Sequence, residues 1–232
     1  MLGPAMSDHP PPFPLPRGMR PRCGCELTFP HVDPAPCVVL TGGPGAGKTA
    51  VLEVVQRQFC EHVVVLPEAA TIVFSGGFPR YDDAAGRRGA QLAIFHVQDQ
   101  MERIERAARG AALVLCDRGL ADGIAYWPGE AGEYWNEVQS SRDETLARYA
   151  AVIHLRTPSA ENGYDRTKNP VRIESAAEAA RIDARIERAW ADHPRRHVIE
   201  ASADFVSKIR AAVALVERYV PECCRHTAHH AH

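Results

Sequence analysis

The sequence predicts an α/β fold in which one sheet of five parallel strands lies between two layers of helices. Three observations support this prediction. Five short apolar runs recur along the chain, and segments with helical periodicity separate them. The runs are apolar on both faces, as strands covered by helices on both sides must be. Helical connections of this kind return the chain in the same direction, which gives a three-layer αβα sandwich with right-handed crossovers.

The predicted strands share a run of apolar or β-branched residues that ends at a glycine, a proline or a charged residue. They cover residues 37–41, 62–66, 112–116, 151–155 and 196–199. A long loop is expected after the second strand, and a polar loop over residues 157–172.

The predicted helices share an apolar residue at every third or fourth position. They cover residues 48–59, a segment that ends before Gly110, most of residues 118–149, residues 175–190 and a last segment over 206–216. In the segment before Gly110 the repeating residues are Ile94, Val97, Met101, Ile104 and Ala108. Two capping boxes, Ser141 with Glu144 and Ser175 with Glu178, mark helix starts.

Length and composition indicate one soluble domain with tails. The chain has 232 residues, of which 45% are hydrophobic and 24% charged. A net charge of -2 does not favour binding to nucleic acid. No apolar run approaches the roughly 20 residues of a membrane helix. We therefore expect no nucleic-acid partner and no membrane partner, and the sequence leaves the oligomeric state open.

Cysteine usage favours a reducing compartment. The chain has 7 cysteines, and its N-terminal segment lacks the apolar core of a secretory signal. Cys37, Cys60 and Cys116 lie in or beside apolar segments, where a thiol is typically a small buried hydrophobe. We expect no disulfide framework, and we expect a cytoplasmic protein.

Both ends of the chain are predicted to be disordered tails. Residues 1–35 are rich in proline, and residues 220–232 are rich in histidine. Thiols and histidines in such tails can bind a transition metal, but neither Cys223-Cys224 nor Cys23-x-Cys25 has the ligand spacing of a zinc module. We interpret them as tail residues. The folded domain then spans residues 36–219.

A glycine-rich motif follows the first strand and opens the first helix. Residues 42–49, Gly-Gly-Pro-Gly-Ala-Gly-Lys-Thr, match G-x-x-x-x-G-K-[ST] in full. Such a loop points successive backbone N–H groups at one anion, and the helix N-terminus adds partial positive charge. We predict that the phosphates of a nucleotide bind at Gly43, Pro44, Gly45, Ala46, Gly47, Lys48, Thr49 and Ala50. The motif identifies a P-loop NTPase domain.

Two residues are predicted to hold a magnesium ion. Thr49 offers its hydroxyl, and Asp117 stands at the end of the third strand, where P-loop proteins carry a metal-binding acid. An alternative for Asp117 is capping of the next helix, and both roles can coexist. The expected cofactors are ATP and Mg²⁺.

Residues after the third strand narrow the class of P-loop protein. Asp117 is followed by Arg118, where motor ATPases need a second acid. GTPases would show D-x-x-G there and N-K-x-D for guanine, and the chain has neither. An acid followed at once by an arginine is instead similar to nucleoside and nucleotide kinases. The predicted fold is therefore nucleotide-kinase-like.

Glu68 lies just beyond the second strand. A carboxylate at this place can orient an acceptor hydroxyl and accept its proton. The alternative is an acid that stabilises the start of a helix.

Four segments together resemble the NadR-type AAA domain family. They are the glycine-rich motif, Pro67-Glu68-Ala69-Ala70, Cys116-Asp117-Arg118-Gly119, and the lid-like run over residues 169–174. The resemblance covers roughly residues 36–218. It implies a P-loop domain of the AAA family, and the family includes both a ribosylnicotinamide kinase domain and regulatory nucleotide-binding domains.

Arginines suit phosphoryl transfer because guanidinium groups stabilise the charge of the transferring group. The predicted catalytic set is Lys48, Glu68, Asp117, Arg118 and Arg172, with Arg172 in the lid. Arg156, at the end of the fourth strand, is predicted to contact the nucleotide. Gln91 and Gln98 could read an acceptor base, or they could be solvated on a helix surface.

Two functions remain open from the sequence. The first is a kinase that transfers the γ-phosphate of Mg-ATP to the hydroxyl of a small, nucleoside-like or other molecule. The second is a switch that binds ATP or GTP, hydrolyses it slowly and acts through a protein partner.

Overall fold

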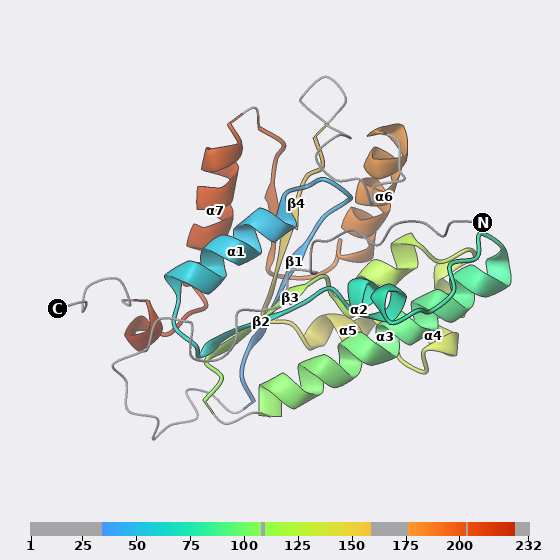
Figure 1. Ribbon diagram of the computed structural model, residues 1–232, viewed down its shortest axis with the longest axis horizontal. Helices are drawn as coiled ribbons and strands as arrows, with labels where there is room; N and C mark the ends of the chain where they lie inside the picture. Colours follow the sequence, from blue (N-terminus) through green and yellow to red (C-terminus); the bar gives the residue numbers. More distant parts are fainter. Residues whose placement is uncertain (1–33, 108–109, 159–175, 203, 226–232) are drawn as a thin grey trace, which may run out of the picture.

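The chain folds around one parallel sheet, as predicted. The computed structural model describes residues 34–107, 110–158, 176–202 and 204–225. Five strands pair in parallel in the order β2-β3-β1-β4-β5 (Figure 1). Their bounds are β1 Cys37–Thr41, β2 Val63–Leu66, β3 Leu113–Asp117, β4 Ala151–Leu155 and β5 Arg196–Ile199.

Alternate residues of β1 point into two different cores, which is why the fold has three layers. Cys37 and Val39 belong to a core on one face of the sheet, while Val38 and Leu40 belong to a core on the other. Helices α1 (Lys48–Gln58) and α7 (Phe205–Glu217) cover the second face, and the remaining larger helices cover the first (Figure 1). These are α3 (Ala84–Ala107), α5 (Arg142–Ala147) and α6 (Ala176–Ala189), with η1 (Leu120–Ala125) and α4 (Ala131–Glu137) beside them.

The segment after β2 differs from the predicted long loop. Helix α2 (Ala69–Ser75) forms directly after Glu68, and α3 already begins at Ala84. The Gly76-Gly77 pair confines the loop to a short connection, because the N–H of Gly76 bonds to the carbonyl of Ile72 and Gly77 adopts a positive φ of 89°.

Helix α3 buries polar side chains beside apolar ones, and the predicted apolar repeat did not include these polar residues. Ile104 is 64% exposed, whereas Gln91, Gln98 and Glu102 are buried. The Glu102 carboxylate accepts hydrogen bonds from Gln98 and from the hydroxyl of Tyr149, at 2.9 Å and 2.8 Å. Partners far away in the sequence therefore decide which face of α3 turns inward, and periodicity cannot detect them.

One of the two predicted capping boxes is confirmed. Ser141 accepts a hydrogen bond from the backbone N–H of Glu144, and the Glu144 carboxylate accepts one from the N–H of Ser141 at the start of α5. The other box includes Ser175, which lies outside the described residues.

The packed part of the chain extends beyond both boundaries that the composition suggested. Ala35 is buried and its N–H bonds to the carbonyl of Arg106. At the other end, Val220 and Cys224 belong to the core beneath α1 and α7, and Glu222–Cys224 form the 3₁₀ turn η3. The predicted tails otherwise lie outside the described residues, and within the described part no helix has the length and apolar character to cross a membrane.

Candidate active site

The carboxyl ends of neighbouring strands bring most of the predicted site residues to one edge of the sheet. β1 runs into the glycine-rich loop, β3 ends at Asp117, and Glu68 follows β2. Because β3 lies between β1 and β2, these three segments are adjacent. Open α/β sheets bind ligands at this edge.

The glycine-rich loop wraps around the side chain of Lys48. Lys48 is the first residue of α1, and its Nζ donates to the carbonyls of Gly42 and Gly43 at 3.1 Å and 3.4 Å. Burial, and next the charge of Arg118, lower the pKa of Lys48, while Asp117 and Glu68 oppose the shift. An anion in the loop would offset both the burial of the Lys48 ammonium and its repulsion from Arg118.

Two glycines of the loop cannot be replaced without distortion. Gly42 has a φ of 137°, and a Cβ there would lie 2.1 Å from the carbonyl oxygen of Leu155. Gly47 has a φ of 97°, and a Cβ there would lie 2.7 Å from the Phe205 ring. The loop is therefore held to a conformation that only glycine permits at these points.

Asp117 has the features of a cation ligand. Its Oδ1 is buried and has no hydrogen-bond partner among the residues that the structure describes. Burial and the nearby Glu68 carboxylate raise its pKa to about 6. Thr49, the other predicted ligand, is exposed at the start of α1. A divalent cation would supply the missing partner, so the site fits Mg²⁺.

Replacing Asp117 with asparagine is expected to stabilise the ligand-free protein at pH 7. The folded state binds a proton here more tightly than the unfolded chain does, so this carboxyl lowers stability as the pH rises from about 4 to about 6. The gain in the free energy of unfolding of the variant over the wild type should therefore be small near pH 4 and reach its full value above pH 6. Urea denaturation of both proteins across this range measures it, and an advantage that shrank with rising pH would contradict the assignment.

Glu68 and Arg118 form an ion pair between the second and third strands. The Arg118 Nε donates to Glu68 Oε1 at 2.6 Å, and the hydroxyl of Thr71 donates to Glu68 Oε2 at 3.1 Å. Burial alone would raise the pKa of Glu68, but Arg118, Lys48 and these hydrogen bonds hold it below its usual value. Glu68 is also the N-cap residue of α2, at the helix start that the alternative interpretation expected. Its role toward an acceptor hydroxyl stays a prediction.

Arg118 adopts a backbone conformation that is unusual for an arginine. Its φ is 73°, in the left-handed region. Its Nη1 donates to the carbonyl of Gly42 at 3.2 Å and to Asp122 Oδ2 at 3.3 Å, and its N–H bonds to the carbonyl of Leu40. These contacts compensate a backbone strain of roughly 1–3 kcal/mol and direct the guanidinium toward the glycine-rich loop.

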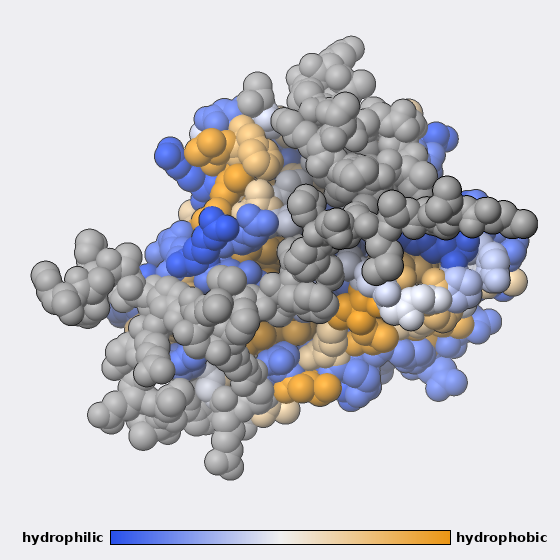
Figure 2. Space-filling view, viewed as in Figure 1, coloured by the Kyte–Doolittle hydropathy of each residue, from blue (hydrophilic) through white to orange (hydrophobic). Residues whose placement is uncertain are grey.

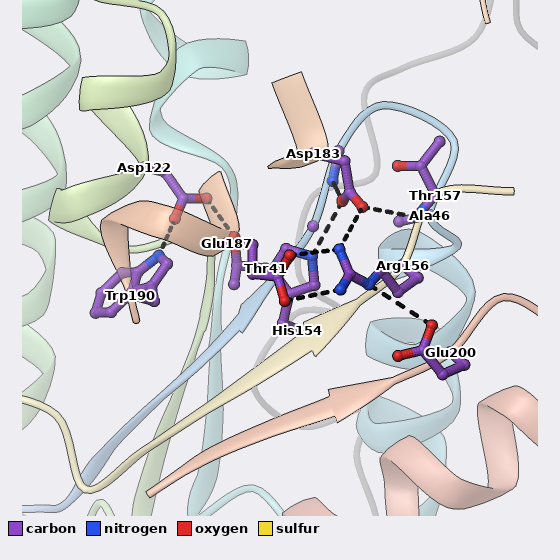
Figure 3. Close-up of polar contacts among 12 residues, drawn as sticks. Thr41, Ala46, Asp122, His154, Arg156, Thr157, Asp183, Glu187, Trp190 and Glu200 are labelled. Carbon is purple, nitrogen blue, oxygen red and sulfur yellow. Dashed lines mark hydrogen bonds and ion pairs between the residues drawn. The ribbon is translucent and has the colours of Figure 1, made fainter. Parts of the chain in front are cut away.

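Asp122, which was not a predicted site residue, accepts a hydrogen bond from Arg118 and is itself fixed by two other donors. Its Oδ1 accepts a hydrogen bond from the Trp190 indole at 2.6 Å, and its Oδ2 accepts one from the Thr41 hydroxyl at 2.6 Å (Figure 3). The buried carboxylate thus connects β1, η1 and the end of α6. Its sequence signal was an acid within the otherwise apolar run Leu120–Ala125.

Asp183 connects helix α6 directly to the glycine-rich loop (Figure 3). The N–H of Gly43 donates to Asp183 Oδ1 at 2.7 Å, the N–H of Thr157 donates to Oδ2 at 3.3 Å, and His154 Nε2 lies 3.1 Å from Oδ1. Burial opposes the ionised form, but these partners hold the pKa of Asp183 below its usual value. The sequence signal was an acid on the inner face of α6, between Ala179 and Ile186.

Arg156 points toward α6 and β5 in the structure. Its guanidinium pairs with Glu187, at 2.8 Å between Nη2 and Oε1, and lies 3.9 Å from Asp183 and 3.6 Å from Glu200 (Figure 3). The predicted contact of Arg156 with a nucleotide stays a prediction. Asp183, Glu187 and Glu200 hold the side chain. The position of Arg156 at a strand end could not predict these partners, because they lie much later in the sequence.

The first turn of α7 lies beside the glycine-rich loop. The buried Lys208 donates to the carbonyls of Ala46 and Arg156 at 2.9 Å and 2.5 Å, and burial lowers its pKa to about 8. Phe205, whose ring faces Gly47, is 49% exposed and Val206 is 54% exposed. Figure 2 shows an apolar patch over this end of α7.

Two other sequence predictions have different outcomes. Arg172, the arginine chosen from the predicted lid, lies outside the described residues. Gln91 and Gln98 are buried rather than solvated, and Gln98 Nε2 donates to the carbonyl of Arg118 at 3.4 Å. Gln98 thus contacts the backbone of the site.

Comparison with known proteins supports both the fold and the motif. A family model described as an AAA domain matches residues 37–208. No curated protein shows a significant match to the sequence.

Solved structures of low sequence identity share the fold. Deoxyadenosine kinase from M. mycoides, with the products dCMP and dCDP, is 14% identical with a TM-score of 0.54, and the match covers 78% of this chain and 99% of that one. NadR in complex with NR is 15% identical with a TM-score of 0.60, and the match covers 81% of this chain. NadR in complex with NAD and AMP-PNP is 15% identical with a TM-score of 0.56, and the match again covers 81% of this chain. This chain spans about half of the NadR chains, 52% and 50%.

Proposed function

Since the chain belongs to the AAA domain family, whose model covers residues 37–208, we propose that it is a P-loop phosphotransferase acting on a small molecule. It transfers the γ-phosphoryl group of ATP to the hydroxyl of a nucleoside-like acceptor. The structural relatives include a deoxyadenosine kinase and a NadR protein solved with NR, which supports an acceptor of this class.

The glycine-rich loop holds the phosphates in this proposal. The backbone N–H groups that follow Pro44, up to Ala50, bind one anion, because the N–H of Gly43 already donates to Asp183. The half-buried Lys48 ammonium supplies the balancing charge. The lowered pKa of Lys48 and its weak hydrogen bonds to two loop carbonyls support this role, because a phosphate would replace those carbonyls as a better partner.

Thr49 and Asp117 would hold the magnesium ion. The ion supplies charge neutralisation to the β- and γ-phosphate oxygens when bound. The buried Asp117 Oδ1, with its missing partner among the described residues, supports this assignment. Asp117 must be ionised for this, so binding of Mg-ATP is expected to weaken as the pH falls through about 6.

One observation carries the proposal of a kinase rather than a hydrolase. The Glu68 carboxylate lies at the same sheet edge as Lys48 and Asp117, and Arg118 holds it in a fixed orientation. Its lowered pKa keeps it ionised at neutral pH. Because phosphoryl transfer proceeds through a loose transition state, the acceptor needs orientation more than a strong base, and Glu68 supplies it.

Three arginines have different roles in the proposal. Arg118 touches Gly42 at the phosphate loop and stabilises charge on the transferring group. Arg156 shapes the site, because Glu187 and Asp183 hold its guanidinium. Arg172 in the predicted lid remains a candidate for the second contact with phosphate.

Mg-ATP is expected to raise the melting temperature of the protein by several degrees. A ligand present at about 100 times its dissociation constant stabilises the native state by about 2.7 kcal/mol, and a domain of this size melts about 2–4 °C higher per kcal/mol. The measurement is a thermal melt with Mg-ATP, Mg-GTP and a panel of nucleosides, including deoxynucleosides and ribosylnicotinamide.

The control for this melt is Lys48→Ala, which should lose the shift with Mg-ATP while keeping its own cooperative transition. An acceptor identified in the panel is then tested for ADP release. ADP release at equal rates with and without every acceptor would contradict a kinase, and it would favour the nucleotide-dependent switch.

A further inference from the structure

A group of thiol and imidazole side chains lies in the core beneath α1 and α7, at the end away from the phosphate loop. Cys60 and His62 precede β2, and Cys224 comes from η3 near the end of the described chain. All three residues are buried, and their ligand atoms lie within 4.8 Å of one another. Figure 1 shows η3 beside the start of β2, on the side of the molecule where α1 ends.

The spacing between these atoms matches a tetrahedral metal site. With Zn–S bonds of about 2.3 Å and Zn–N bonds of about 2.0 Å, two ligand atoms of a tetrahedron lie roughly 3.5–3.8 Å apart. Cys224 Sγ is 3.7 Å from His62 Nδ1 and 3.7 Å from Cys223 Sγ. The edge from Cys224 to His62 therefore already has the required length. Cys223 lies at that distance from Cys224, but outside the group of three whose ligand atoms all lie within 4.8 Å of one another.

We propose that Cys60, His62, Cys223 and Cys224 form a structural zinc site that fastens the C-terminal turn to the start of β2. Three thiols and an imidazole are donors that select Zn²⁺ over Mg²⁺ or Ca²⁺. Cys223 is exposed and provides the route by which the ion enters. The thiols bind as thiolates, so each coordinating cysteine releases its proton to solvent and no oxidant is needed.

The position of the ligands explains why the sequence spacing gave no zinc pattern. Cys60 and His62 belong to one turn, in which the N–H of Val63 bonds to the carbonyl of Cys60. Cys223 and Cys224 are contributed by a turn more than a hundred residues later. A metal here would close a long loop, and such closures restrict the unfolded chain most.

The structure offers a matched control in a second buried group of the same kind. Cys37, Cys116 and Glu102 also lie within 4.8 Å of one another, in the other core. Glu102 there is already bonded to Gln98, Tyr149 and Arg148, so its oxygens are committed to protein donors. We therefore assign no metal to it, and Cys37→Ala tests the assignment.

The experiment titrates Co²⁺ into the reduced, metal-free full chain and follows absorption in the near ultraviolet and the visible. We expect thiolate-to-cobalt charge transfer together with the intense visible bands of a tetrahedral ion, and Zn²⁺ should displace both. The histidine-rich end of the chain could bind cobalt by itself, but without thiolates it would give no charge-transfer band.

Variants separate the proposal from its alternatives. Cys224→Ala and His62→Gln should each weaken Co²⁺ binding by more than the roughly 10–100-fold loss that follows removal of an outer-shell partner. Cys223→Ser should lower the charge-transfer intensity, and Cys37→Ala should leave the spectrum unchanged. Circular dichroism and a cooperative melt without metal confirm that each variant folds, and His62→Gln leaves all thiols in place if the Cys224 variant fails to fold.

Three results would overturn the proposal. They are cobalt binding without charge transfer, a charge-transfer spectrum that survives Cys224→Ala, and a Cys60–Cys224 disulfide found by mass spectrometry in protein that binds no metal.

Discussion

Replacing Asp183 with alanine is expected to lower the free energy of unfolding by about 3–5 kcal/mol, which is a large part of the stability of an ordinary domain. The carboxylate is buried and accepts hydrogen bonds from the N–H groups of Gly43 and Thr157. Its removal leaves these donors and the His154 imidazole without their partner in a region closed to water. Urea denaturation measures the loss.

The same variant should also weaken nucleotide binding, because Gly43 belongs to the phosphate loop. The matched control is Glu178→Gln, on the same helix, where an exposed pair with Arg181 is worth less than about 1 kcal/mol. A loss below about 1 kcal/mol for Asp183→Ala, similar to the control, would show that Asp183 does not fasten the loop.

Replacing Glu68 with glutamine is expected to lower acceptor-dependent ADP release by roughly 10²–10⁴-fold. The amide keeps the size of the side chain but cannot accept the proton of the acceptor hydroxyl, and it weakens the ion pair that Arg118 makes at 2.6 Å. The melting shift with Mg-ATP should remain, because Glu68 does not touch the phosphate loop in the described contacts.

The pattern of kinetic and binding effects separates catalysis from folding. Glu133→Gln removes a carboxylate from an exposed ion pair with Arg88 and should leave turnover unchanged. If Glu68→Gln retained full turnover with a productive acceptor, the role of Glu68 would be limited to the start of α2. If it lost the shift with Mg-ATP as well, Glu68 would be needed for nucleotide binding and not specifically for transfer.

Local signals were sufficient for the sheet and for the phosphate loop. A buried parallel strand is a short run of apolar residues, and this pattern located all five strands to within one residue at each end. The loop at residues 42–49 is set by glycines and one lysine that are contiguous in sequence, so its pattern can be recognised without tertiary information. The family model matches residues 37–208 and so covers this loop.

Apolar periodicity did not predict the buried polar residues of α3, because contacts with distant segments stabilise them. Met101 of the predicted apolar repeat packs against the core, but Ile104 is exposed, and Gln98 and Glu102 are buried on the inner side of α3. Their partners, Tyr149 and the carbonyl of Arg118, are fixed by other elements. A buried polar side chain is stable only with such partners, and a pattern that counts apolar residues cannot represent them.

The sequence by itself determined the three-layer fold, the phosphate loop and the acids expected beside it, because each depends on residues close together along the chain. The tertiary structure alone decided that Asp183 holds Gly43, that Arg156 pairs with Glu187, and that Cys224 packs against His62. The physical reason is that a charge or a thiol acquires its role from the groups that surround it after burial. Those groups come from segments whose proximity is created only by folding.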